Sequence, residues 1–397
     1  MSAATLEILD LVGRWVHVIA GIMWIGNSLL FNWLDRSLVP ARAPGQTKKP
    51  IGSIWLLHSG GFYYVEKTLL EGEKLPVPLH WFMWQALSTW ISGVFLLIVV
   101  YYAGGRATLE DPAVAGISHG WAIVIGVASL VGGRLIYDIM QRAPARAEKI
   151  ATAVWIAALT AIAIALTQLL SGRAAFLHAG AMLATIMAGN LTNTIVPSQK
   201  ALVKSVEGGA ADAAMSAKAK RVSIHNNYFT FPVIALMVSN HFSSIYGSRY
   251  NWAVLLVIIA GGAAVRHVLN VRWTFRSWQP ALGATIAATV LALWILVNLG
   301  NRTTSATAQV VFSGPISFED ARHIIDRRCA VCHSERPTDR TFGPAPAGVM
   351  FDTREQIEAR AARIRERAFV TRTMPPANKT GITDAERATL GAWVSQK

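Results

Sequence analysis

Cys329 and Cys332 are the only cysteines in the chain, and they stand in the run Cys329-Ala330-Val331-Cys332-His333. This C-x-x-C-H spacing is typical of covalent haem attachment, with two thioether bonds and the histidine as first axial ligand of the iron. A zinc site would need further ligands nearby, and a thioredoxin-like redox pair would need a βαβ context. The spacing therefore favours one covalent haem c, a carrier of single electrons.

The iron of such a haem usually takes a second axial ligand, and two methionines are available. Met374 is followed by Pro375 and Pro376, which would stiffen the loop that presents its thioether. Met350 is the alternative, but it lies closer to His333 in the chain and leaves less length to reach the other face of the haem. We predict His333 and Met374 as the iron ligands, a pair that raises the reduction potential and suits an electron acceptor.

Polar residues also interrupt apolar stretches earlier in the chain, where they are costly and indicate function. His225, Asn226 and Asn227 follow one another at the entrance of an apolar segment, for which a hydrated helix cap is the alternative interpretation. Asn190 and Asn193 are spaced to share one face at the end of the preceding apolar segment.

The elements that must position these residues are membrane helices. The chain has 397 residues, of which 53% are hydrophobic and only 15% charged, too apolar for an ordinary soluble protein. A spanning helix needs roughly 20 mostly apolar residues. Eight segments qualify: 9–33, 81–102, 117–137, 150–170, 174–195, 228–246, 252–270 and 279–299. We read the shorter stretch Ile51 to Tyr64 as an interfacial or re-entrant piece.

The net charge of +14 is explained by the loops between these spans, so a nucleic-acid partner is not needed. Lysine and arginine gather in the odd-numbered loops, whereas the even-numbered loops carry only Arg106, Arg173 and Arg249. The positive-inside rule then places the odd loops in the cytoplasm and both termini outside a bacterial inner membrane. The haem motif, which follows the last span, lies on the periplasmic side.

The histidines of the membrane region fall into two layers, an arrangement similar to b-type cytochromes. The outer layer contains His17, His119, His178 and His241, and the inner layer His58, His80, His225 and His267. Single membrane histidines are explained by interhelical hydrogen bonds, but the set leaves open a haem b. His17 and His241 are our leading ligand candidates, and Trp15 to Gly26 resembles the opening helix of membrane protoporphyrinogen oxidases.

The composition changes after Gly300. We expect a membrane domain over 1–300, a polar linker over 301–315 and a small domain over 316–397. Capping-box patterns at Ser317 with Asp320 and at Thr383 with Glu386 predict helices at both ends of the small domain. The predicted fold is all-α: an eight-helix transmembrane bundle followed by a class I cytochrome c-like domain.

The apolar spans, the His225-Asn226-Asn227-Tyr228 segment and the trailing haem motif together resemble the bacterial integral-membrane urate oxidases over essentially the whole chain. The resemblance implies oxidation of urate to 5-hydroxyisourate, with electrons leaving through the cytochrome instead of forming hydrogen peroxide. A periplasmic cytochrome c or a terminal oxidase would then accept these electrons. Composition and spacing alone indicate only a haem-containing membrane oxidoreductase.

The polar residues suit that chemistry, because urate is planar, anionic and rich in donors and acceptors. His225 is the first candidate for the base, and the positioning residues would be Asn190, Asn193, Asn226 and Asn227. Weaker candidates are His58, His80, Glu66 and Arg134. Arg134 and Asp138 stand four apart, so a salt bridge within one helix is the structural alternative for that pair.

Two other functions remain open on the sequence. One is a respiratory electron-transfer module that takes electrons from quinol and has no purine substrate. The other is a purine transporter with a redox-sensing tail. A haem–copper oxidase is disfavoured by the number of spans and the lack of an adjacent histidine pair.

Overall fold

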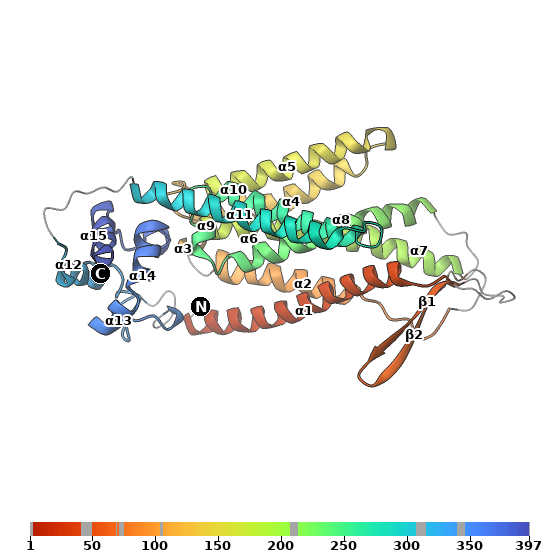
Figure 1. Cartoon of the computed structure of the whole chain (residues 1–397), viewed down its shortest axis with the longest axis horizontal. Helices are drawn as coiled ribbons and strands as arrows, with labels where there is room; N and C mark the ends of the chain where they lie inside the picture. The colour runs from red at the N-terminus through yellow and green to blue at the C-terminus, as the bar shows by residue number, and fades with distance from the viewer. Residues whose placement is uncertain are drawn as a thin grey trace.

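The computed structural model describes residues 3–40, 50–68, 70, 75–103, 106–206, 213–306, 315–339 and 346–396. It consists of a long helical bundle with a small helical domain at one end (Figure 1). The N-terminus lies at the end of the bundle that carries this C-terminal domain. The opposite end carries a β-hairpin and the helix α7.

The bundle is built from long helices that are mostly apolar. They are α1 (Ala3–Ser37), α2 (Met83–Leu96), α4 (His119–Met140), α5 (Glu148–Leu169), α6 (Gly172–Asn190), α7 (Val196–Val206), α8 (Ala213–Ser239), α10 (Asn251–Val271) and α11 (Trp278–Ala306). Two π-helical stretches extend α2 and α6, namely η1 (Leu97–Tyr102) and η3 (Leu191–Ile195). Short helices fill the connections: α3 (Arg106–Leu109), η2 (Ala145–Ala147) and α9 (Ser243–Tyr246).

Among the described residues, seven helices are long and apolar enough to cross a membrane. Several predicted spans are thereby confirmed as apolar helices of sufficient length. The helix α8 has 27 residues but is not one of the seven. Lys218, Lys220 and Arg221 lie in its first half, and the run His225-Asn226-Asn227 lowers the hydropathy of the uncharged remainder. The helix α8 packs between α6 and α10, so the count of eight spans stays a prediction.

The predicted span 228–246 is misplaced. The helix that contains it begins at Ala213 and ends at Ser239, and the chain then turns into α9. A search for apolar residues misses the basic first half of α8, although the helix continues through it. The helix α11 runs to Ala306, within the predicted linker, and residues 307–314 lie outside the described residues, so the domain boundaries stay a prediction.

The segment predicted as an interfacial or re-entrant piece is a β-hairpin, and the all-α prediction is wrong there. Strand β1 (Pro50–His58) pairs antiparallel with β2 (Gly61–Thr68), with Trp55 opposite Tyr64. Ser59 and Gly60 form the turn with φ values of 50° and 76°, the left-handed pair that two-residue hairpins favour. β-branched and aromatic residues on both strands favour this extended pairing.

The helix α6 is the centre of the bundle. The apolar window of the α6–η3–α7 rod is 72% buried, more than in any other candidate span. Its small residues allow close approach: a Cβ on Gly180 would lie 3.1 Å from Leu236 of α8. Such small-residue contacts are how helices associate in lipid, where the hydrophobic effect between them is weak.

The C-terminal domain contains α12 (Phe318–Arg328), η4 (Pro346–Gly348), α13 (Arg354–Ala359), α14 (Ala361–Ile364), η5 (Arg365–Val370), η6 (Pro376–Asn378) and α15 (Asp384–Ser395). Both predicted capping boxes are confirmed, at Ser317 for α12 and at Thr383 for α15. The two terminal helices pack together through a core that includes Ile325, Leu390 and Trp393.

Candidate functional site

Asn190 is the centre of a buried polar network at the end of α6 that leads into η3 and α7. Its amide nitrogen donates to Oδ1 of Asn226 at 2.8 Å and to the Tyr137 hydroxyl at 3.1 Å. Its amide oxygen accepts from Nη1 of Arg134 at 3.0 Å. Only 1% of the surface of Asn190 is exposed, and both its amide nitrogen and its amide oxygen are hydrogen-bonded. These bonds join α4, α6 and α8.

Arg134 has two roles in this network. Its Nη2 lies 2.7 Å from Oδ1 of Asp138, so the predicted salt bridge within α4 is confirmed. Its guanidinium also reaches α6, where a Cβ on Gly189 would lie only 2.4 Å from it. Glycine at 189 therefore makes room for the cation that holds Asn190.

The consecutive residues His225, Asn226 and Asn227 point to different neighbours of α8. Nδ1 of His225 lies 2.7 Å from the Tyr137 hydroxyl, on the side of α4 and α5. Oδ1 of Asn227 accepts from Arg266 at 2.8 Å and from Asn270 at 2.7 Å, both on α10. Asn226 alone of the three faces the cavity described next.

A cavity of about 380 Å³, which we call the inner cavity, opens among α1, the segment before α2, η3, α7 and α8. Aromatic and polar side chains share its walls. The aromatic ones are Trp24, Phe31, Trp81 and Phe82. The polar ones are Asn27, Ser28, His80, Gln199, Ser223, Asn226 and Thr230. Ring faces beside amide, hydroxyl and imidazole groups suit a planar ligand with donors and acceptors along its edges.

Of the predicted catalytic residues, only Asn226 lines this cavity; the weaker candidate His80 lines it as well. Asn190 stands behind Asn226, and His225 and Asn227 face other helices. Asn193 is exposed and accepts from Thr192 at 3.0 Å. The expectation that Asn190 and Asn193 share a face is wrong, because a π-helical turn begins at Leu191 and shifts the positions after it.

Sequence reasoning missed Asn27, Ser28 and Gln199 in the cavity and Tyr137 in the network. Asn27 directly follows the Trp15 to Gly26 segment and is an amide inside an apolar helix, which was the available signal. Gln199 follows the π-helical turn, and no sequence pattern predicted that turn. Of the other weaker candidates, His58 and Glu66 lie on the hairpin.

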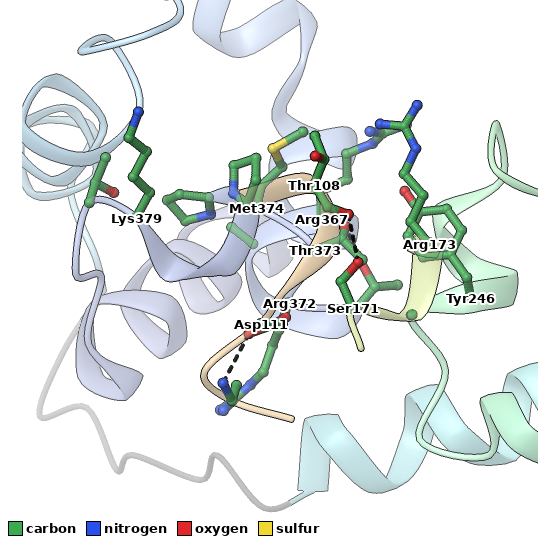
Figure 2. Close-up of a pocket in the computed structure, with 18 of the residues that line it drawn as sticks. Thr108, Asp111, Ser171, Arg173, Tyr246, Arg367, Arg372, Thr373, Met374 and Lys379 are labelled. Atoms are coloured by element: carbon green, nitrogen blue, oxygen red, sulfur yellow. Dashed lines mark hydrogen bonds between the residues drawn. The ribbon is translucent and has the colours of Figure 1, made fainter. Parts of the chain in front are cut away.

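A second cavity, of about 810 Å³, lies at the other end of the molecule between the bundle and the C-terminal domain (Figure 2). The C-terminal domain contributes Cys329, Cys332, His333 and Met374. Met350, the alternative iron ligand, does not line it. The bundle contributes Thr108, Asp111, Ser171, Gly172, Arg173, Tyr246, Ser248, Arg249 and Asn251, among others.

The local fold orients both predicted axial ligands. Nδ1 of His333 lies 3.0 Å from the Val349 carbonyl, which fixes the ring and leaves Nε2 for a metal. The Met374 loop is tied down by Arg387, which is 4% exposed and donates to the Met374 carbonyl at 2.7 Å. Burial lowers the pKa of Arg387 to about 10.

The state of the two thiols bears on the alternatives for the C-x-x-C-H run. Burial raises the pKa of Cys329 to about 12 and also raises the pKa of Cys332, whereas a redox-active pair needs a stabilised thiolate. No group of three or more His, Cys, Asp or Glu side chains that could hold a metal ion occurs among the described residues. In the part of the chain that the structure describes, the C-x-x-C-H run is therefore not joined by the further ligands that zinc needs. Two thiols, an oriented imidazole and a thioether around one cavity fit a covalently bound haem.

The histidines proposed for a haem b are less favourably placed. His178 uses both ring nitrogens, with Nε2 3.0 Å from the Tyr102 hydroxyl and Nδ1 2.8 Å from the Ala174 carbonyl. Nδ1 of His17 lies 3.0 Å from the carbonyl oxygen of Thr89. Neither His17 nor His241 lines either of the two cavities described above. A haem b in the membrane domain stays a prediction.

Comparison with known proteins identifies a family. No curated protein and no solved structure matches the chain. A family model described as "Urate oxidase N-terminal" matches residues 3–298, which include the bundle up to the last turns of α11 and the inner cavity but not the C-terminal domain. Because the match covers well over half of its length, the chain belongs to the urate oxidase N-terminal family.

Proposed function

We propose that the protein oxidises urate in the inner cavity and passes the electrons to a haem c held by the C-terminal domain. The observation that carries the proposal is the cavity itself, in which aromatic walls meet Asn226 and the network behind it, within the part of the chain that matches the urate oxidase family. Urate and water would yield 5-hydroxyisourate, two protons and two electrons.

The cavity wall suggests how urate is held. The amide of Asn226 is fixed by Asn190 and by its own bond to the Met187 carbonyl at 3.0 Å. A pre-oriented amide of this kind binds a substrate edge without a further loss of side-chain entropy. Gln199 and Asn27 offer an amide donor and an amide acceptor from other walls of the cavity, and Trp24 and Trp81 provide ring faces.

A base must accept a proton from urate or from the attacking water. His80 lines the cavity, so in this proposal it is the base. His225 is separated from the cavity by Tyr137, Asn190 and Asn226. Since amide N–H groups orient their partners and do not pass protons readily, His225 becomes a positioning residue that fixes the Tyr137 hydroxyl.

The haem would be held by thioether bonds to Cys329 and Cys332, and His333 and Met374 would bind its iron. It would supply a one-electron acceptor at a raised potential. The acceptor beyond it would be a periplasmic cytochrome c or a terminal oxidase. This orientation is supported by the basic odd-numbered loops and by the position of the N-terminus and the C-terminal domain at one end of the bundle.

Turnover in isolated membranes tests the proposal. Urate loss, hydrogen peroxide and reduction of an added cytochrome c are measured for the wild type and His333→Ala. We expect the wild type to reduce the cytochrome without peroxide, and His333→Ala to lose urate turnover. Full activity of His333→Ala with peroxide as product would overturn the electron route. Reduction by quinol but not by urate would instead indicate a respiratory module.

A further inference from the structure

The cavity between the two domains is lined by an excess of cations. Eight arginine and lysine side chains face it, against one carboxylate, that of Asp111. The cations are Arg173, Arg249, Arg328, Arg360, Arg363, Arg367, Arg372 and Lys379. Arg328, Arg372 and Lys379 form ion pairs with acidic residues of the C-terminal domain. For the other five, no ion pair is found among the described residues, so the cavity suits an anionic ligand.

Arg173 belongs to the membrane domain, and only part of the hydrogen-bonding capacity of its guanidinium is occupied. It lies in the first turn of α6, and its Nη2 donates to Oδ1 of Asn240 at 3.1 Å. Its Nε is buried and makes no hydrogen bond of good geometry among the described residues, and the buried Tyr101 hydroxyl is the neutral group within its reach. An unpaired buried guanidinium nitrogen is costly, and a carboxylate is the group that a guanidinium binds best. Arg173 is also one of the few cations on the outer loops, where the positive-inside rule disfavours them.

Arg367 approaches from the C-terminal domain. Its carbonyl accepts from the backbone nitrogen of Met374 at 3.0 Å, so it is adjacent to the predicted thioether ligand. Tyr246 lies within electrostatic reach of both Arg173 and Arg367. Figure 2 shows Arg173 and Tyr246 on the bundle side of the cavity, with Arg367 and Met374 facing them.

The two domains are in close contact around these arginines. A Cβ on Gly247 would lie 2.6 Å from Cγ2 of Thr373. Ser243 donates to Oε1 of Glu366 at 3.4 Å. A ligand in the cavity would therefore touch both domains.

We propose that Arg173 and Arg367 together bind a carboxylate of the haem, so that the cofactor attached to one domain is also held by the other. This inference rests on the proposed haem c. The membrane domain would thereby influence the potential of a haem that it does not ligate. A cation beside the haem carboxylates favours the reduced iron, and its removal lowers the potential.

Spectroelectrochemical titration of the full-length holoprotein tests the assignment. We expect Arg173→Gln and Arg367→Gln each to lower the midpoint potential of the haem c. The double variant should shift it by less than the sum, because both act on one carboxylate. Arg142→Gln removes a charge at the other end of the bundle and should leave the potential at the wild-type value. Arg173→Lys, which keeps the charge but not the planar fork, should give a smaller shift.

Redox-difference infrared spectra distinguish direct binding of Arg173 to the haem carboxylate from a long-range effect of its charge on the potential. Arg173→Gln should move the carboxylate stretching bands of the haem, whereas Arg142→Gln should not. An unchanged potential and unchanged bands in Arg173→Gln, with haem content equal to wild type, would overturn the inference and leave the proposed function standing. Absence of covalent haem in the wild type, by pyridine haemochrome, would instead contradict the proposed function.

Discussion

The side-chain amide of Asn190 donates to Oδ1 of Asn226 at 2.8 Å, joining α6 to α8 directly behind the inner cavity. The same nitrogen also donates to Tyr137, so both of its protons are used. Asn226 is thereby fixed with its amide at the cavity wall.

Asn226→Ala should reduce kcat/KM for urate by about 10- to 100-fold. The variant removes one hydrogen bond to the anionic substrate, worth about 1.5–3 kcal/mol, which corresponds to this range. Steady-state kinetics measure the effect. Asn193→Ala is the matched control, because Asn193 is exposed on η3 and should change kcat/KM less than twofold. Equal losses in the two variants would refute the placement of urate.

His80→Gln should lower kcat by about 10²- to 10⁴-fold, the usual contribution of a general base. His225→Gln should lower it less, since His225 contacts Tyr137 and Trp155 and not the cavity. The measurement is kcat across pH for both variants. If His225→Gln lost the larger factor together with a limb of the pH profile, the sequence-based assignment of His225 as base would be right and ours wrong.

Met374→Ala should lower the midpoint potential of the haem c and change the axial-ligand bands in its absorption spectrum. Loss of a thioether ligand destabilises the reduced iron. Met350→Ala should leave both unchanged, since Met350 does not line the cavity. The reverse pattern would identify Met350 as the ligand.

Glu386 should make the C-terminal domain sensitive to acid. Burial alone would raise the pKa of Glu386, but the backbone N–H of Thr383 and the guanidinium of Arg328 hold it below its usual value. A lowered folded-state pKa contributes stability above the unfolded value, near 4.5, and this stability is lost as the pH falls through the lower folded value.

Glu386→Gln should therefore cost roughly 1–2 kcal/mol near neutral pH and flatten the stability profile below about pH 4.5. Unfolding of the holoprotein, followed by haem absorbance, measures both effects. Glu319→Gln is the control, because Glu319 lies exposed in the first turn of α12. If the acid profile of Glu386→Gln matched that of the wild type, this carboxylate would not be the source of the acid sensitivity.

The sequence was most informative where one local rule decides the structure. Apolar length predicted most bundle helices, and the spacing of Ser317 with Asp320 predicted a helix start. The hairpin was missed because apolar residues such as Trp55, Leu57 and Phe62 stand exposed on it, without the one-sided alternation of a half-buried strand. The basic start of α8 was missed because only apolar residues were counted.

The candidate site was harder to predict because it depends on contacts between distant segments. Asn190 and Asn226 were identified as polar residues in apolar surroundings, but their pairing requires the packing of α6 against α8. The separation of Asn190 from Asn193 depends on a π-helical turn, and the cavity role of Gln199 depends on the helix after it. No local pattern specifies either feature.

Anaerobic stopped-flow mixing of the purified holoprotein with urate tests the central claim most directly. We predict that the c-type absorption band becomes reduced as urate disappears, with one urate reducing two haems because each accepts a single electron. Urate consumption with the haem left oxidised would contradict the account. So would a haem that urate leaves oxidised and quinol reduces.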